Sequence, residues 1–130
     1  METEEKFGVS RATEYVEQSK IALAGHESCH ELTACMLSAV LGEGSRAKIL
    51  IVGAGGTGLE IITAGNLELY WDFVAVEPSA PMLEIARNSI SQAGLSNRTT
   101  FHQGYVDDLD LEASFDAAIM FGVFQYFWQR

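Results

Sequence analysis

The segment from residue 48 to residue 77 limits the possible folds more than any other part of the chain. It begins with a short apolar run over residues 48–52, typical of a strand that is buried on both faces of a parallel sheet. A turn with glycines at positions 53, 55, 56 and 58 follows, then a helical pattern from about Thr57 to Ala64. A second strand is predicted over residues 71–76, with Glu77 at its end. This order predicts a βαβ unit whose glycine turn and acid meet at the carboxyl edge of a sheet.

The rest of the chain continues the same alternation. Ser79 is a suitable N-cap, and Pro81 fits the first turn of a helix that runs to about Ala93 and closes at Gly94. Further strands are predicted over residues 99–102 and 115–121, and two helices, over residues 10–24 and 27–41, precede the sheet. The fold class is therefore α/β, with a Rossmann-like parallel sheet behind two N-terminal helices. We divide the chain into a helical segment, residues 1–46, and a sheet-forming part, residues 47–130.

The glycine turn and the acid after the second strand point to a nucleotide ligand. Glycines allow a sharp turn and a close approach of the ligand to the main chain, and the helix behind them offers unpaired N–H groups. A carboxylate at Glu77 can accept hydrogen bonds from both ribose hydroxyls of a nucleoside. Gly53, Gly55 and Gly58 also match the G-x-G-x-x-G pattern of NAD-binding domains, so the turn alone leaves a nicotinamide-dependent oxidoreductase as an alternative.

Charge and composition restrict the partners and the compartment. The 130 residues include 18 acidic and 8 basic residues, for a net charge of −10, which disfavours binding to nucleic acid or anionic lipid. The sequence has no apolar run of membrane-spanning length, and its acidic N-terminus differs from a leader peptide. Cys29 and Cys35 fall on different sides of one predicted helix, so we expect reduced thiols and a cytoplasmic protein without a membrane partner.

Several stretches in order resemble class I S-adenosylmethionine-dependent methyltransferases. Residues 49–60, Ile-Leu-Ile-Val-Gly-Ala-Gly-Gly-Thr-Gly-Leu-Glu, are similar to the signature loop of that family. Residues 74–87, which contain Glu-Pro-Ser-Ala-Pro-Met-Leu, are the more specific match and argue against the oxidoreductase. Residues 101–104 with Leu109, and then residues 115–118, continue the resemblance, which covers about residues 47–127.

The resemblance implies that S-adenosylmethionine is the cofactor, and it assigns roles along the carboxyl edge. The residues implied to face the methionine moiety are Gly53, Ala54, Gly55 and Gly58. Glu77 would bind the ribose, with Pro78 and Met82 against the adenine. The segment Gly104, Tyr105 and Val106 would cover the other edge of the adenine, and Met120 and Phe121 would line the sulfonium side.

Two departures from the family pattern concern this site. The glycine turn is one residue longer than the commonest version. Tyr105 stands where an Asp that meets the adenine amino group is common, so Asp107, Asp108 or the main chain is the candidate for that contact. We identify no catalytic base: His26 and His102 are candidates, while Asp116 is expected to be structural.

The N-terminal segment contains His-Glu-Ser-Cys-His, which matches the H-E-x-x-H pattern of zinc proteases. A family-specific third ligand is missing downstream, so we predict no metal site and expect His26 at a helix start and His30 half-buried. The segment also resembles the part of several methyltransferases that folds over the bound cofactor, with Tyr15, Gly25 and His26 in comparable places. A cofactor lid and simple packing on the sheet both stay open.

The last ten residues are rich in aromatic side chains, and the sequence stops where the family normally continues through three more strands. We therefore expect an incomplete sheet with an open edge and a homodimer formed through it. The resulting hypothesis is the cofactor-binding portion of an S-adenosylmethionine-dependent methyltransferase that acts on an unidentified acceptor, a small molecule rather than a nucleic acid. The alternatives are a catalytically silent module that binds S-adenosylmethionine or S-adenosylhomocysteine, and an NAD-dependent oxidoreductase domain.

Overall fold

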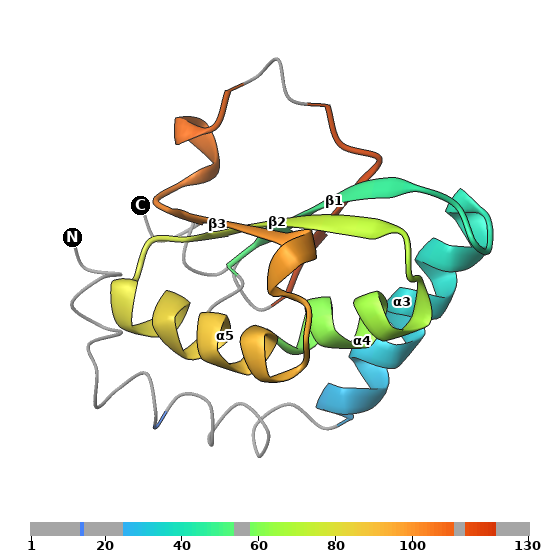
Figure 1. The fold of residues 1–130 in the computed structure, drawn as a ribbon, viewed down its shortest axis with the longest axis horizontal. Helices are drawn as coiled ribbons and strands as arrows, with labels where there is room; N and C mark the ends of the chain where they lie inside the picture. Colours follow the sequence, from blue (N-terminus) through green and yellow to red (C-terminus); the bar gives the residue numbers. More distant parts are fainter. Residues whose placement is uncertain (1–13, 15–24, 54–57, 111–113, 122–130) are drawn as a thin grey trace.

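The protein forms a four-stranded parallel sheet with its helices gathered on one face (Figure 1). The structure is a computed structural model, and it describes residue 14 and residues 25–53, 58–110 and 114–121. The strand order is β3-β2-β1-β4, and every pairing is parallel. The elements, in chain order, are α3 (His26–Leu41), β1 (Ala47–Val52), α4 (Leu59–Leu67), β2 (Trp71–Glu77), α5 (Ala80–Gln92), η1 (Ser96–Arg98), β3 (Thr99–Gln103), η2 (Val106–Asp108) and β4 (Ala117–Met120).

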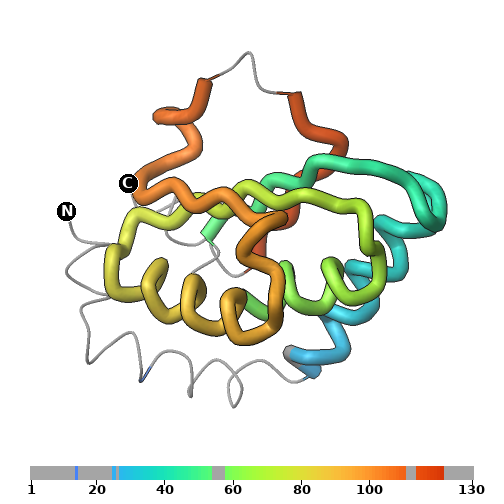
Figure 2. The backbone as a smooth tube through the Cα atoms, in the orientation of Figure 1, coloured from blue at the N-terminus to red at the C-terminus, as the bar shows by residue number. Residues whose placement is uncertain are grey.

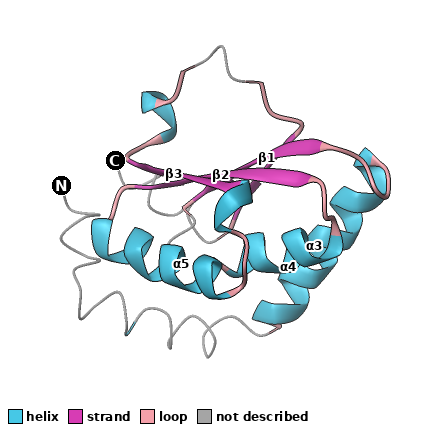
Figure 3. Cartoon of the chain, viewed as in Figure 1, coloured by secondary structure: helices cyan, strands magenta, loops and turns pink. Residues whose placement is uncertain are grey.

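The two faces of the sheet are covered differently. Helices α3, α4 and α5 lie along one face, whereas loops and the single turn η2 lie on the other (Figure 3). Residues alternate in direction along a strand, so Ile49 and Ile51 of β1 enter the main core on the helical side. Leu50 and Val52 join a smaller cluster on the opposite side. The central strands are therefore apolar on both faces, as the sequence predicted.

Hydrogen bonds tie the loops at the amino edge of the sheet to one another. The buried carboxylate of Glu68 accepts from the Ser38 hydroxyl and from the Gly44 N–H, which joins the end of α3 and the loop after it to the end of α4. The Arg98 guanidinium donates to three main-chain carbonyl oxygens, those of Gly65, Glu68 and Trp71, at 2.8 to 3.1 Å. These bonds hold η1, α4 and the start of β2 together.

The fold class predicted from the sequence is confirmed, and the element bounds differ by a few residues. Helix α4 starts at Leu59 and not at residue 57, because Gly58 adopts a left-handed conformation (φ 62°) and belongs to the turn. Strand β4 starts at Ala117 and not at residue 115, since Asp116 and Lys48 exchange two hydrogen bonds just before it, which also confirms a structural role for Asp116. The helix expected over residues 10–24 lies outside the described residues, apart from Glu14. Both cysteines are free thiols.

Candidate cofactor site at the carboxyl edge of the sheet

The strand ends that the sequence placed together do meet at one edge of the sheet. The Gly53 N–H, directly after β1, donates to the Val76 carbonyl of β2 at 2.8 Å. The Gly104 N–H, directly after β3, donates to the Glu77 carbonyl at 3.0 Å. The turn after β1, the end of β2 and the loop after β3 are thus hydrogen-bonded in series. The chain can be followed from one to the next along the smooth trace in Figure 2.

Glu77 lies in the middle of this series. Its side chain is buried, with 6% of its surface exposed, and one carboxylate oxygen accepts from the Ser79 N–H at 3.0 Å. Ser79 in turn caps α5, because its hydroxyl accepts from the Met82 N–H. The start of α5 therefore fixes the direction of the Glu77 carboxylate at the strand end where a ribose would bind.

The glycine turn is described at its two ends, whereas Ala54 and Gly55 lie outside the described residues. Gly58 is the N-cap residue directly before α4, and a Cβ built on it would lie 3.0 Å from Cδ1 and Cγ1 of Ile90 on α5. Glycine at this position thus lets the start of α4 approach α5 closely, as the third glycine of a dinucleotide-type turn does for its helix and sheet.

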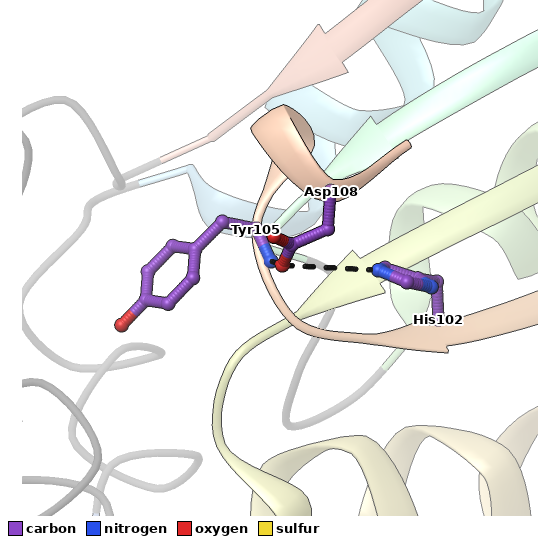
Figure 4. A network of polar contacts seen from close by, with 3 residues as sticks. All are labelled: His102, Tyr105 and Asp108. Atoms are coloured by element: carbon purple, nitrogen blue, oxygen red, sulfur yellow. Dashed lines mark hydrogen bonds and ion pairs between the residues drawn. The ribbon is translucent and has the colours of Figure 1, made fainter. Parts of the chain in front are cut away.

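The loop after β3 is held by a compact polar network (Figure 4). The Asp108 carboxylate accepts from the Tyr105 N–H at 2.8 Å, and the Asp108 N–H donates back to the Tyr105 carbonyl at 3.0 Å. His102 Nε2 lies 4.0 Å from the same carboxylate oxygen. Asp108 therefore binds its own loop, and the Tyr105 ring points away from the histidine–aspartate pair (Figure 4).

The remaining predicted cofactor residues occupy varied surroundings, and their roles stay predictions. Met82 is buried at 3% exposure, whereas Pro78 is half-buried at the strand end. Val106 packs against the smaller apolar cluster on the sheet face without helices. At the end of β4, Met120 is 48% exposed, and Phe121 packs edge-on against His30 with ring centroids 4.7 Å apart.

The H-E-x-x-H sequence forms the start of α3, and it takes part in no metal site within the described residues. Helix α3 begins at His26, as expected, but His30 is buried at 3% exposure, and the expectation of a half-buried side chain was wrong. Packing against Phe121, the residue directly after β4 and distant in sequence, accounts for the difference. Within the described residues, no group of three or more His, Cys, Asp and Glu side chains could hold a metal ion. No described helix is both long and apolar enough to cross a membrane.

Glu60, in the first turn of α4, belongs to this edge, but the sequence analysis did not identify it as a site residue. Its side chain is half-buried, and burial raises its pKa to about 7. The negative charge of Glu77 raises the pKa further, while a hydrogen bond from the Glu60 backbone opposes the shift. The one available signal was an acid two residues after the last glycine of the turn.

The fold and this edge define a Rossmann-like domain, the class that binds nucleotide cofactors at the carboxyl ends of parallel strands. A family model described as a methyltransferase domain matches residues 49–130, and the chain belongs to that family. No curated protein was found to match the sequence.

Solved structures of methyltransferases share the fold. An S-adenosyl-L-methionine-dependent methyltransferase of Methanococcus maripaludis superposes with a TM-score of 0.75 at 24% identity, over 95% of this chain and 53% of that one. A Thiobacillus denitrificans methyltransferase in complex with S-adenosyl-L-homocysteine superposes with a TM-score of 0.56 at 20% identity, over 68% of this chain and 35% of that one. A Salinibacter ruber RNA methyltransferase, in complex with the same ligand, superposes with a TM-score of 0.57 at 17% identity, over 68% of this chain and 56% of that one. The chain therefore spans about half the length of the first of these structures.

Proposed function

We propose that this chain binds S-adenosylmethionine at the carboxyl edge of its sheet and forms the cofactor-binding portion of a methyltransferase. The observation that carries the proposal is the buried Glu77 carboxylate, fixed by the start of α5 between the loops that follow β1 and β3. Membership of the methyltransferase-domain family supports the proposal. So does the S-adenosyl-L-homocysteine present in two solved structures of the same fold.

In this proposal each strand end has a separate task. Glu77 accepts the ribose hydroxyls, the turn from Gly53 to Gly58 lies along the methionine moiety, and the loop at Gly104 borders the adenine. Methyl transfer from a sulfonium is an in-line displacement by the acceptor's nucleophile, so the protein's main task is to hold the reacting atoms in line. The exposed Met120, at the end of β4, would then face the acceptor side.

Titration with S-adenosylhomocysteine tests the cofactor site directly. We expect the Glu77→Ala variant to bind about 10 to 100 times more weakly than the wild type, because a hydrogen bond to a charged group contributes roughly 1.5–3 kcal/mol. The measurement is isothermal titration calorimetry at pH 7.5. Glu84→Ala, which removes an exposed carboxylate from α5, is the matched control and should bind like the wild type.

Two outcomes would contradict the proposal. If the wild type binds NADH and not S-adenosylhomocysteine, the domain belongs to an oxidoreductase. If Glu77→Ala binds S-adenosylhomocysteine as tightly as the wild type does, the ribose site is not at this edge. A silent binding module is distinguished by its activity: a longer chain that includes this domain should consume S-adenosylmethionine when its acceptor is present, and a silent module should not.

The acceptor is proposed to be a small molecule, since the net charge of −10 opposes the approach of a polyanion.

We also propose that two copies associate through the outer side of β4, which pairs only with β1 among the described strands. Unpaired strand edges favour such association, and a lysine on the edge strand opposes it. Sedimentation at increasing concentration should therefore show dimers for the wild type and monomers for Ala118→Lys. A wild type that stays monomeric over the whole concentration series would contradict the dimer.

A further inference from the structure

We propose that His30 is a positioning residue that holds the Phe121 ring against the sulfonium group of the bound cofactor. In this proposal Phe121 contacts the positively charged end of S-adenosylmethionine, and His30 acts only through the Phe121 ring. The two rings then determine how well the site distinguishes S-adenosylmethionine from S-adenosylhomocysteine. The inference rests on the proposed function, because it names a determinant of selectivity within the same site.

Phe121 lies beside the glycine turn. In the parallel pairing of β1 with β4, Val52 is in register with Met120. Gly53 and Phe121 are the next residues after the two strands, so they follow side by side at the carboxyl edge of the sheet. On the other side of Gly53, its N–H is bonded to Val76 of β2. Phe121 therefore borders the turn that is proposed to lie along the methionine moiety.

The Phe121 side chain lies on the helical side of the sheet. Like Ile119, two residues earlier, it belongs to the main apolar core, and side chains two residues apart in a strand share a face. Helix α3 lies on the same side (Figure 1). Its His30 ring meets the Phe121 ring with centroids 4.7 Å apart and an angle of 72° between the ring planes. Edge-to-face packing of this kind favours one orientation of the Phe121 ring.

The two rings differ in exposure. His30 is buried, with 3% of its surface exposed, and the surrounding core fixes its ring. Phe121 is only half-buried, so part of its ring surface stays available to a ligand. A buried ring that supports a partly exposed ring fits a positioning role, because contact with the ligand is left to the outer ring. His30 thereby gains a task that the proposed function leaves unassigned.

The sulfonium end of the cofactor suits an aromatic neighbour. A cation within about 6 Å of the centre of an aromatic ring is attracted by the negative face of that ring. S-adenosylmethionine carries a positive sulfonium and its methyl group, whereas S-adenosylhomocysteine has a neutral thioether at the same place. A contact with Phe121 should therefore favour the first ligand, while the ribose and adenine are identical in both.

Other groups at this edge also distinguish the two ligands. Glu60 and Glu77 are carboxylates close enough to influence each other, and their negative charge favours a cation as well. This contribution is common to the wild type and to variants of His30 or Phe121. The measured quantity is therefore the ratio of the two affinities, S-adenosylmethionine to S-adenosylhomocysteine, compared between proteins.

The first test is calorimetric titration of both ligands into the wild type and single variants. Phe121→Leu keeps an apolar side chain and removes the ring, so the ratio should fall about fivefold. His30→Leu leaves the Phe121 ring without its aromatic neighbour, and the ratio should fall by at least about threefold. His30→Phe retains an aromatic ring at this position and should keep the wild-type ratio.

A double variant tests whether His30 acts through Phe121. In the Phe121→Leu background, adding His30→Leu should leave the ratio unchanged, because the ring that His30 positions is already absent. A general loosening of the core would instead weaken the binding of both ligands together. The cycle does not depend on His30→Phe, whose larger side chain has to fit into the buried site.

Two matched controls make similar changes elsewhere in the core. Phe101→Leu is the same substitution on β3, where the ring packs against the main core and lies 4.5 Å from the Arg87 guanidinium. Leu37→Ala removes a partly buried apolar side chain from α3 itself. Both variants should keep the wild-type ratio, even where they lower the two affinities in proportion.

The outcomes separate this inference from the proposed function. If the wild type binds neither ligand, the proposed function is wrong and the inference falls with it. If the wild type binds both ligands but Phe121→Leu or His30→Leu keeps its ratio, the cofactor site stands and the inference is overturned. A His30→Leu effect on the ratio that persists in the Phe121→Leu background would also overturn it, because His30 would then act by another route.

Discussion

At the scale of single residues, the candidate site contains two carboxylates in different surroundings. Glu77 is buried, and its carboxylate accepts a hydrogen bond from the N–H of Ser79, the N-cap residue of the helix that follows. Glu60 is half-buried on the adjacent helix, and burial raises its pKa to about 7. The charged form of Glu60 is therefore disfavoured in the folded protein, which connects the stability of the empty domain to pH.

The sign of this connection can be predicted. The ordinary pKa of Glu60 is 4.5 and its folded-state pKa is about 7, so between these values the folded chain binds more protons than the unfolded chain. The Glu60 contribution to the free energy of unfolding should thus fall as pH rises from about 4.5 to about 7. Glu60→Gln, which mimics the neutral acid, should remove this dependence and raise stability at pH 8 by on the order of 1–2 kcal/mol. Urea unfolding from pH 5 to pH 8, without ligand, measures both effects. If the variant is no more stable at pH 8, Glu60 is not desolvated.

At the scale of elements, side chains hold the loops opposite the site in place. Arg98, in the short helix before β3, donates to the carbonyls at the end of α4 and at the start of β2. Carbonyls in the last turn of a helix lack partners within the helix, and a guanidinium can satisfy several of them at once. Arg98 therefore connects three elements that are distant in sequence.

Replacing Arg98 should cost more than replacing another arginine of the same domain. Arg98→Met keeps most of the apolar stem and leaves three carbonyls without this donor, so we expect unfolding to be easier by about 3 kcal/mol. Arg87→Met is the control, since Arg87 is exposed on α5 and its pair with Glu84 at 3.5 Å contributes less than about 1 kcal/mol. Chemical unfolding followed by circular dichroism compares the two. Equal losses would mean that the Arg98 hydrogen bonds contribute little to stability.

At the scale of the whole molecule, local patterns predicted the fold class and most of the sheet edge. The apolar run of β1, the glycine turn and the Ser79 cap each depend on neighbours within a few residues, so the sequence is sufficient to place them. Features that depend on distant segments were harder to predict. The sequence did not predict that Phe121 would bury His30, that Glu77 would act on Glu60, or that Asp108 would face His102 across Gly104.

The strand order also has a consequence for the way the chain assembles. Strands β1, β2 and β3 pair with neighbours along the sequence, but β4 returns to β1, and its first contact joins Lys48 and Asp116, 68 positions apart. Closing so long a loop carries a larger entropic cost than forming the local crossovers. The first three strands can therefore form a folding nucleus, and β4 is expected to dock onto it last. During synthesis, the ends of β2 and β3 would then come together before the end of β4 arrives.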